Sequence, residues 1–174
     1  MILKHKFHPN ILREYDIRGI VGKTLHEKDA FFLGKSFGTK IIQDGGQSVC
    51  VGHDGRDSSP SLCKALIDGL SQTGLIIKNV QLGPTPMLYF AVKHYDADGG
   101  IMITGSHNPP DYNGFKIVQR TRPVYGQAIQ ELSDIAQSGN FALGQGTTTN
   151  YDIRQNYIQR LLKDLTADRP LNIA

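Results

Sequence analysis

A hydroxyl, an imidazole and an ammonium group are carried by neighbouring parts of this sequence. Ser106 and His107 lie in the run T-G-S-H-N-P-P at positions 104–110, directly after an apolar segment, and Lys116 lies in the next apolar segment. These are groups that nucleophilic and acid–base catalysis use. Ser, Asn, Gly and Pro are also common turn residues, so spacing alone leaves both a catalytic loop and an ordinary turn open.

A serine hydrolase of the Ser-His-Asp type is a poor match to this run. The nucleophile elbow of such enzymes has the pattern G-x-S-x-G, with a glycine two positions on either side of the serine. Thr104 and Asn108 occupy those positions around Ser106. If the loop is catalytic, it therefore belongs to another class of enzyme.

Two further polar segments stand where the chain is expected to turn. The run G-H-D-G-R-D-S-S-P at positions 52–60 leads from a strand to a helix, and helix N-termini bind anions. It is neither a P-loop nor a dinucleotide fingerprint, so a capped turn with Arg56 tied to nearby carboxylates is the alternative. In the run E-Y-D-I-R-G at 14–19, Asp16 and Arg18 share one face of an extended segment, where the alternative is a surface ion pair on an edge strand.

Length and composition favour one folded domain. The chain has 174 residues, of which 39% are hydrophobic, so it can bury a core and is not disordered as a whole. No apolar run approaches the roughly 18 residues that cross a bilayer. The 19 basic residues give a net charge of only +3 and form no block of the kind found in nucleic-acid domains. We therefore expect no membrane and no nucleic-acid partner.

The cysteines and the N-terminus point to the cytoplasm. Cys50 and Cys63 lie in apolar patterns without metal-ligand spacing, so they are predicted to be two buried thiols. The first residues lack the apolar core of a signal peptide.

Strand-like and helix-like patterns alternate along the chain. Extended segments are predicted at 11–20, 48–52, 75–82, 100–104 and 115–118. Helices are predicted at 28–43, 127–136 and 152–165, and two more after Ser59-Pro60 and Thr85-Pro86. This alternation predicts an α/β domain of three layers, with a four-stranded mixed sheet between helices. Ligands of such sheets bind beyond the carboxyl ends of strands, which places the loops at 53–59 and 105–114 at the expected site.

Two helix faces carry more specific expectations. Ala30, Gly34 and Gly38 form a stripe of small residues on the first helix, which indicates close packing against another element. The last helix is predicted to bury one face, made of Ile153, Tyr157, Leu161 and Leu165.

Four motifs follow one another in the chain: R-E-Y-D-I-R-G at 13–19, G-R-D-S at 55–58, G-P-T-P at 83–86 and T-G-S-H-N-P-P-D-Y-N-G-F-K at 104–116. Together they resemble the α-D-phosphohexomutase superfamily, and within it the bacterial phosphomannomutase/phosphoglucomutase branch. The resemblance runs from about residue 10 to the C-terminus and falls within the first domain of that family.

The resemblance implies a phosphoryl-transfer reaction. Ser106 would carry a phosphoryl group in the resting enzyme and donate it to a hexose 1- or 6-phosphate, through hexose 1,6-bisphosphate as the intermediate. Mg²⁺ would bind the serine phosphate, so Ser106 would supply one metal ligand through that phosphate, with the other ligands in an absent domain.

The resemblance also implies roles for the residues around the serine. Lys116 and His107 would act as general acid/base and as phosphate partners. Arg18 would support the phosphoserine region, Tyr15 the substrate side, and Asn108 the shape of the loop.

The other functional loops of the family do not occur in this sequence. These are the metal loop D-G-D-G-D-R, the sugar loop G-E-x-S-G-H and a phosphate-binding loop in the last domain. We therefore expect residues 1–168 to form the phosphoserine domain and residues 169–174 to begin the next domain. The remaining domains of the same enzyme and hexose phosphates are the expected partners, and the chain alone is expected to fold but to have little or no mutase activity.

Two alternatives stay open. Phosphoglucosamine mutases favour S-A-S-H-N-P at the serine loop, whereas Thr104 and Gly105 precede Ser106 here. The second alternative is a non-catalytic phosphosugar-binding or interaction domain.

Overall fold

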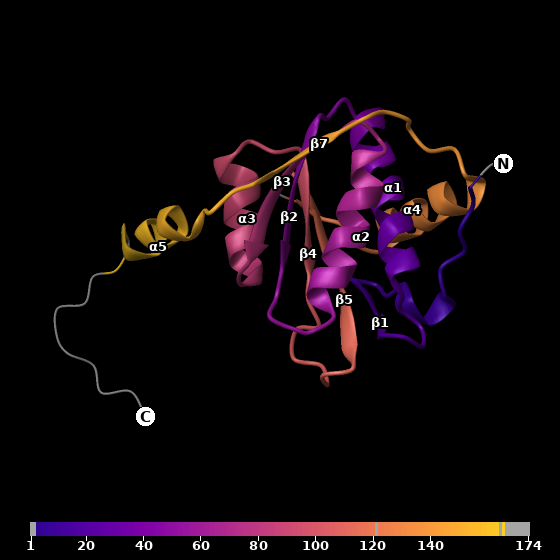
Figure 1. The fold of residues 1–174 in the computed structure, drawn as a ribbon, viewed down its shortest axis with the longest axis horizontal. Coiled ribbons are helices and arrows are strands. Elements are labelled where there is room, and N and C mark those ends of the chain that lie inside the picture. Colours follow the sequence, from indigo (N-terminus) through magenta and orange to yellow (C-terminus); the bar gives the residue numbers. More distant parts are fainter. Residues whose placement is uncertain (1–2, 121, 164, 166–174) are drawn as a thin grey trace.

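A seven-stranded mixed sheet forms the centre of the computed structural model, which describes residues 3–120, 122–163 and 165 (Figure 1). The strand order is β1-β5-β4-β2-β3-β7, and β6 pairs with β5 beside β1. β2, β3, β4 and β7 run parallel to one another, whereas β5 is antiparallel to both of its main neighbours, β1 and β4. The strands are β1 (Ile17–Ile20), β2 (Ser48–His53), β3 (Ile76–Leu82), β4 (Gly99–Ile103), β5 (Tyr112–Gln119), β6 (Arg122–Pro123) and β7 (Thr147–Asn150).

The expectation of four strands is wrong, although the mixed sheet is confirmed. The four apolar segments predicted from the sequence correspond to β2, β3, β4 and β5. β1 lies within the extended segment predicted at 11–20, and the strands that were not predicted, β6 and β7, lie at the edges of the sheet, where little burial is needed. Every residue of β7 is exposed, and β6 has only two residues, so neither carries the hydrophobic pattern by which strands are recognised.

Helices cover both faces of the sheet, which confirms the three layers (Figure 1). On one face, α1 (Glu27–Gln43), α2 (Ser59–Ser71) and α4 (Gln127–Ser138) close over the larger part of the core. On the other face, α3 (Thr85–His94) packs on a second cluster that includes Val80, Met102 and Val118. The helices predicted after Ser59-Pro60 and Thr85-Pro86 are α2 and α3, with these prolines in their first turns and with Ser58 and Pro84 as the cap residues.

Close approach between α1 and α2 confirms the stripe of small residues. A Cβ on Gly34 would lie 2.3 Å from the carbonyl oxygen of Leu66, and one on Gly38 would lie 2.4 Å from Oγ1 of Thr73. On α2, a Cβ on Gly69 would lie 2.0 Å from the carbonyl oxygen of Phe31. The two helices therefore meet backbone to backbone. This contact fixes the position of α2 and of the turn of residues 54–58 that leads into it.

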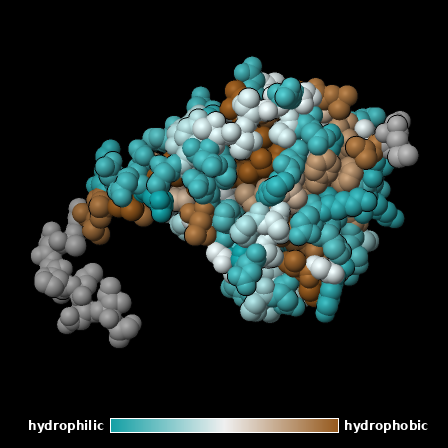
Figure 2. Space-filling model, viewed as in Figure 1, coloured by the Kyte–Doolittle hydropathy of each residue, from teal (hydrophilic) through white to brown (hydrophobic). Residues whose placement is uncertain are grey.

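The last helix departs from its predicted packing. α5 (Arg154–Lys163) contacts α3 through Tyr157, whose ring lies 5.7 Å from that of Phe90, and Ile153 just before it is buried. Leu161 and Leu165 were expected in the core but are 56% and 64% exposed. Figure 2 shows hydrophobic surface at this projecting end of the molecule. The proposed boundary between residues 168 and 169 lies outside the described residues.

Two remaining expectations concern cysteine and membranes. Cys50 and Cys63 are free and buried, as predicted, and burial raises the pKa of each thiol to about 12. Across the described residues, the helices are too short or too polar to cross a bilayer.

Candidate active site around Ser106

Several segments meet at the edge of the sheet where β2 and β4 end. The loop of residues 104–111 connects β4 to β5, and the turn of residues 54–58 connects β2 to α2. Val21, which follows β1, donates its amide to the carbonyl of Asp111 and so brings a third segment to this edge. An open depression of about 560 Å³ lies here, lined by Val21, Asp54, Gly55, Arg56, Asp57, Ser58, Ser106, Asn108 and Pro110. The site is therefore at the strand ends where the alternation of elements predicted it.

Ser106 occupies an unusual backbone conformation on this loop. Its φ angle is +53°, in the left-handed region that residues other than glycine rarely adopt. Its amide donates to Oγ1 of Thr104 across 2.9 Å, and its exposed hydroxyl lies 3.3 Å from Nδ1 of His107. Strained residues of this kind persist where the surrounding structure holds them, and they cluster at active sites.

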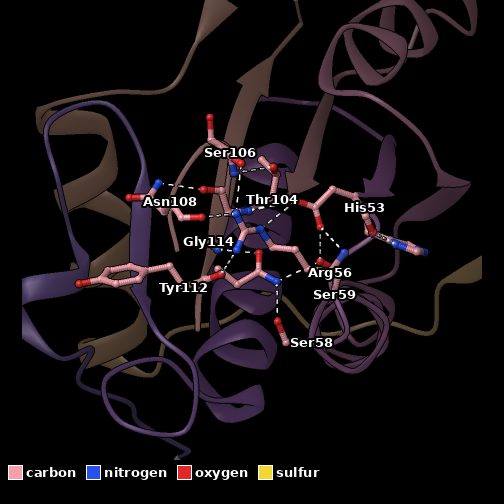
Figure 3. Close-up of polar contacts among 12 residues, drawn as sticks. His53, Arg56, Ser58, Ser59, Thr104, Ser106, Asn108, Tyr112 and Gly114 are labelled. Carbon is pink, nitrogen blue, oxygen red and sulfur yellow. Dashed lines mark hydrogen bonds and ion pairs between the residues drawn. The ribbon is translucent and has the colours of Figure 1, made fainter. Parts of the chain in front are cut away.

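Arg56 reaches from the β2–α2 turn into the centre of the loop (Figure 3). Nη1 donates to the carbonyls of Pro109 and Tyr112 at 2.7 and 3.0 Å. Nη2 donates to those of Ser106 and Asn108 at 3.1 and 2.6 Å. The expected tie to a carboxylate exists, because Nε lies 3.5 Å from Asp54, but the four backbone carbonyls are the main partners.

Gly105 makes room for this guanidinium. A Cβ at position 105 would lie 2.3 Å from both Nε and Cζ of Arg56 and 2.8 Å from the carbonyl oxygen of Tyr112. The absence of a side chain at Gly105 thus allows the backbone to approach Arg56 closely. Any larger residue here requires the guanidinium to move.

Asp54 joins the same network from the end of β2. Its carboxylate accepts from the amides of Arg56 and Gly105 at 3.1 Å each and from Oγ of Ser59 at 2.6 Å. Burial raises the pKa of this carboxyl, but hydrogen bonds from Ser59, Arg56, Thr104 and Gly105 outweigh burial and hold the pKa below its usual range. Asp54 is therefore an ionised anchor for the start of the serine loop.

Asn113 secures the far end of the loop. Its side chain is fully buried and donates through Nδ2 to Oγ of Ser58 at 2.8 Å and of Ser59 at 2.9 Å. These bonds fix β5 to the N-terminus of α2, which the packing against α1 already holds. The loop is thus fastened at both ends to rigid elements.

Arg18 and Asp16 form the ion pair expected from their spacing on β1. Nη1 of Arg18 also donates to Oδ1 of Asn108 across 3.1 Å, and Nδ2 of Asn108 donates to the carbonyl of Gly105 across 2.8 Å. The pair is consequently more than a surface contact, because it reaches the loop that carries Ser106.

The structure does not join every predicted residue to this cluster. Lys116 pairs with Met102 across β4 and β5, is half-buried, and has no hydrogen-bond or ion-pair partner among the described residues. Its side chain shares a face of the sheet with that of Arg18, because Arg18 pairs with Gly114 and strand residues two apart face the same way. Tyr15 is 76% exposed, and its ring lies 6.2 Å from that of Tyr125. Ser106, His107, Asn108 and Arg18 are brought together, whereas no hydrogen bond or ion pair links Lys116 or Tyr15 to Ser106.

Sequence reasoning missed the roles of Arg56, Asp54 and Asn113. The G-R-D-S run predicts a capped turn, and that prediction does not include contacts with a loop some fifty residues away. Every residue has a backbone carbonyl that can accept a hydrogen bond. The sequence of the 104–111 loop therefore does not indicate that Arg56 binds there.

The described residues do not form a complete metal site. No group of three or more His, Cys, Asp and Glu side chains that could hold a metal ion occurs in residues 3–120, 122–163 and 165. Asp54, the acidic residue beside the serine loop, is occupied by its own hydrogen-bond donors. An oxygen at Ser106 would be one ligand for Mg²⁺, and the carboxylates of the described residues do not gather around it into a complete site.

Comparisons with known proteins find relatives of this sequence and this fold. The family profile described as phosphoglucomutase/phosphomannomutase, alpha/beta/alpha domain I, matches residues 9–142. A phosphoglucomutase from Neisseria meningitidis serogroup B is 42% identical over 167 residues, and a phosphomannomutase/phosphoglucomutase from Pseudomonas aeruginosa is 40% identical over 164 residues. A crystal structure of a phosphoglucomutase/phosphomannomutase family protein from Burkholderia thailandensis superimposes with a TM-score of 0.90 at 40% identity.

The matched regions make up nearly all of this chain but only a minor part of each relative. The alignments cover 95% and 94% of this chain but only 36% of the Neisseria protein and 35% of the Pseudomonas protein. The Burkholderia superposition covers 95% of this chain and 38% of that one. The chain thus spans about a third of the length of the curated relatives it matches.

Proposed function

Because this chain belongs to the phosphoglucomutase/phosphomannomutase family and matches its domain I, we propose that it carries the phosphoserine of a phosphohexomutase. The reaction interconverts hexose 1-phosphate and hexose 6-phosphate, with glucose or mannose as the sugar. The phosphoryl group passes through hexose 1,6-bisphosphate. The complete activity needs protein outside the third of the family's length that this chain spans.

The geometry of Ser106 is the observation that carries this proposal. Its hydroxyl is exposed on a left-handed turn at the end of β4, while Arg56, Asp54 and Asn108 hold the loop beneath it. An open and firmly held hydroxyl supports in-line phosphoryl transfer, which depends on positioning more than on covalent chemistry within the protein.

The transfer step exchanges one phosphorus–oxygen bond for another. The bond between phosphorus and Ser106 Oγ breaks while a hydroxyl oxygen of the hexose phosphate bonds to phosphorus. The sugar hydroxyl releases its proton to a general base, and a general acid gives a proton to Ser106 Oγ as the phosphoryl group leaves. His107 is assigned this proton transfer together with Lys116, because Nδ1 of His107 lies 3.3 Å from Oγ.

A phosphorylated Ser106 needs nearby positive charge, because phosphoserine carries about −1.5 to −2 charges at neutral pH. Arg18 is paired with Asp16 and bonds to Asn108, so it supports the loop and lends a partly offset charge. Lys116 has no partner among the residues that the structure describes, so its ammonium is available to the phosphate. Tyr15, exposed at the outer edge, is assigned to the substrate side.

Mg²⁺ is part of the proposal only through Ser106. When bound, the ion would offset phosphate charge, and an oxygen of the serine phosphate would be one of its ligands. The described residues provide no carboxylate cluster to complete that site, so its other ligands belong to protein outside this chain.

The proposed partners follow from the same chemistry. They are hexose phosphates, hexose 1,6-bisphosphate and the remaining domains of the enzyme, and residues 169–174 would begin the second domain. The unpaired, buried thiols suit the reducing cytoplasm, where we place the protein.

The glucose/mannose branch is preferred over a phosphoglucosamine mutase because of Gly105. An alanine at that position, as in the S-A-S-H-N-P loop, would place its Cβ 2.3 Å from Arg56 Nε. The present loop is built around a glycine, which favours the T-G-S-H-N-P branch. No observation favours a non-catalytic domain, because the serine hydroxyl is exposed and supported as a reacting group would be.

The test uses this chain in place of the matching third of the Pseudomonas aeruginosa enzyme. Such a chimera is expected to convert glucose 1-phosphate to glucose 6-phosphate in a coupled assay and to carry a phosphate detectable by intact-mass analysis. Ser106→Ala should abolish both. Ser138→Ala, which removes an exposed hydroxyl at the end of α4, serves as the matched control and should preserve both.

The 174-residue chain without the other domains should show little or no turnover in the same assay. A phosphate retained by Ser106→Ala would contradict the assignment of the phosphoserine. Turnover by the single chain at the rate of the chimera would contradict the need for further domains.

A further inference from the structure

We propose that Arg56 is a positioning residue for Ser106, which holds the serine in its left-handed conformation by gathering the carbonyl groups of the loop. Its effect on catalysis rests on the proposed function. Its effect on the loop does not, and can be measured separately.

The guanidinium of Arg56 has no donor left for a substrate phosphate. An arginine side chain has five N–H groups, of which four are on the two terminal nitrogens. Those four point to the carbonyls of Ser106, Asn108, Pro109 and Tyr112, and Nε faces Asp54. The side chain is only 17% exposed. Arg56 is thus saturated by the loop, which separates it from arginines that bind phosphate directly.

Both peptide groups of Ser106 are fixed in this arrangement. The amide N–H is bound by Thr104 Oγ1, and the carbonyl is bound by Arg56 Nη2. With these two bonds in place, the residue cannot relax to negative φ without breaking one of them. Backbone conformations that are unfavourable alone persist when neighbours over-determine them.

The orientation of the carbonyl also sets the orientation of the next amide. In a trans peptide the N–H points opposite to the C=O, so the N–H of His107 points away from Arg56. Among the described residues this N–H has no acceptor. Figure 3 shows the Ser106 hydroxyl on the side of the loop away from the guanidinium. Arg56 therefore places a free backbone donor on the same side as the reacting hydroxyl.

Arg56 can perform this role because its own backbone is held in place. It lies in the turn before α2, and α2 packs backbone to backbone on α1 through Gly34 and Gly69. A lysine in its place would keep the charge, but its single ammonium has three donors and cannot span four carbonyls.

The first experiment measures amide hydrogen exchange in the 174-residue chain. Arg56→Lys is expected to speed exchange by about tenfold or more at Asn108 and Tyr112, whose amides bond within the loop. Exchange at Ile101 in the core strand β4 should not change. Arg154→Lys, which alters an exposed arginine paired with Asp152, is the control and should leave all three unchanged.

Equal acceleration at Ile101 would mean that Arg56 supports the whole fold and would overturn the proposal. Unchanged exchange at Asn108 and Tyr112 would overturn it as well, because the loop would then be held without Arg56.

The second experiment measures kinetics in the chimera described above. Arg56→Lys is expected to lower kcat about 100-fold while KM changes by less than about threefold, because a displaced nucleophile weakens the chemical step more than substrate binding. Arg56→Gly should regain part of its kcat when guanidinium ion is added below denaturing concentration, which a loss of global stability would not allow.

The two arms distinguish failure of the inference from failure of the proposed function. If the unsubstituted chimera folds but is inactive, the mutase assignment fails, and hydrogen exchange alone decides the role of Arg56. If the chimera is active and Arg56→Lys keeps its kcat, the inference is wrong while the function stands.

Discussion

Nη1 of Arg18 donates to Oδ1 of Asn108 across 3.1 Å, and this bond joins the edge strand β1 to the loop that carries Ser106. Residues ninety positions apart in the chain are thereby coupled at the site. Asn108 connects Arg18 to the start of the serine loop, because its Nδ2 also donates to the carbonyl of Gly105.

Replacing Asn108 with alanine should destabilise the fold. Both bonds are lost, and the partners left behind are partly buried, so the free energy of unfolding should fall by roughly 1–2 kcal/mol. Asn10→Ala, at an exposed position in the N-terminal segment, should change it by less than about 0.5 kcal/mol. Urea unfolding of the two variants side by side measures the difference, and equal midpoints would show that the Arg18–Asn108 contact adds no stability.

A second prediction concerns the pairing of β1 with β5. A Cβ on Gly114 would lie 2.2 Å from the carbonyl oxygen of Ile17, which is backbone and cannot swing aside. Gly114→Ala should therefore lower the free energy of unfolding by about 1–3 kcal/mol. Gly55→Ala is the matched control, because the nearest atom to its Cβ would be 3.9 Å away. Thermal unfolding that ranks the two variants in the opposite order would refute this account.

A third prediction follows from the lowered pKa of Asp54. A carboxyl whose pKa is lower in the folded state stabilises that state above the unfolded pKa of about 3.9, and the contribution disappears as the pH falls through the folded pKa. Asp54→Asn should thus be less stable than wild type at pH 6, and the gap should narrow in strongly acidic solution. Urea unfolding over this pH range tests the sign, with the exposed Asp134→Asn as control. A gap that widens in acid would be incompatible with an ionised anchor.

A fourth prediction concerns the thiols. Burial raises the pKa of Cys50 and of Cys63 to about 12, and neither side chain is open to solvent. Both should be inert to a disulfide reagent at pH 8 in the native protein, because the thiolate is the reactive form. Both thiols should react rapidly when the protein is unfolded in guanidinium chloride. A rapidly reacting thiol in the native state would place one of them outside the core.

Elements that bury an apolar face could be predicted from the sequence. Elements whose position depends on residues far away in the chain could not. The helix predicted at 28–43 is α1, whose buried Leu33, Phe37 and Ile41 recur every four residues, because a helix that packs on a sheet must repeat its apolar residues. β7, with the sequence Thr-Thr-Thr-Asn, buries none of its residues and is held by pairing with β3, so it lacks the apolar pattern by which strands are predicted. The apolar face of α5 follows the same repeat as that of α1, yet Leu161 is exposed, because periodicity does not say which surface covers a helix.

Some features of the serine loop could likewise be predicted from the sequence, and others could not. Ser106 and His107 could be recognised from the run that contains them, and Arg18 from its family motif. The left-handed conformation of Ser106 and the four carbonyl contacts of Arg56 could not, since they arise only when β2, β4 and β5 are assembled side by side.

The contacts of Arg56 also tie the site to the order in which the chain folds. They join residues 50 to 56 positions apart, across α2, β3, α3 and β4. Such non-local contacts require a long loop to close and form late relative to local helices. A nascent or partly unfolded chain can thus contain its helices and still lack a fixed Ser106. Under the proposed function, phosphoryl acceptance at that serine would therefore require the assembled sheet, because Arg56 meets its loop partners only there.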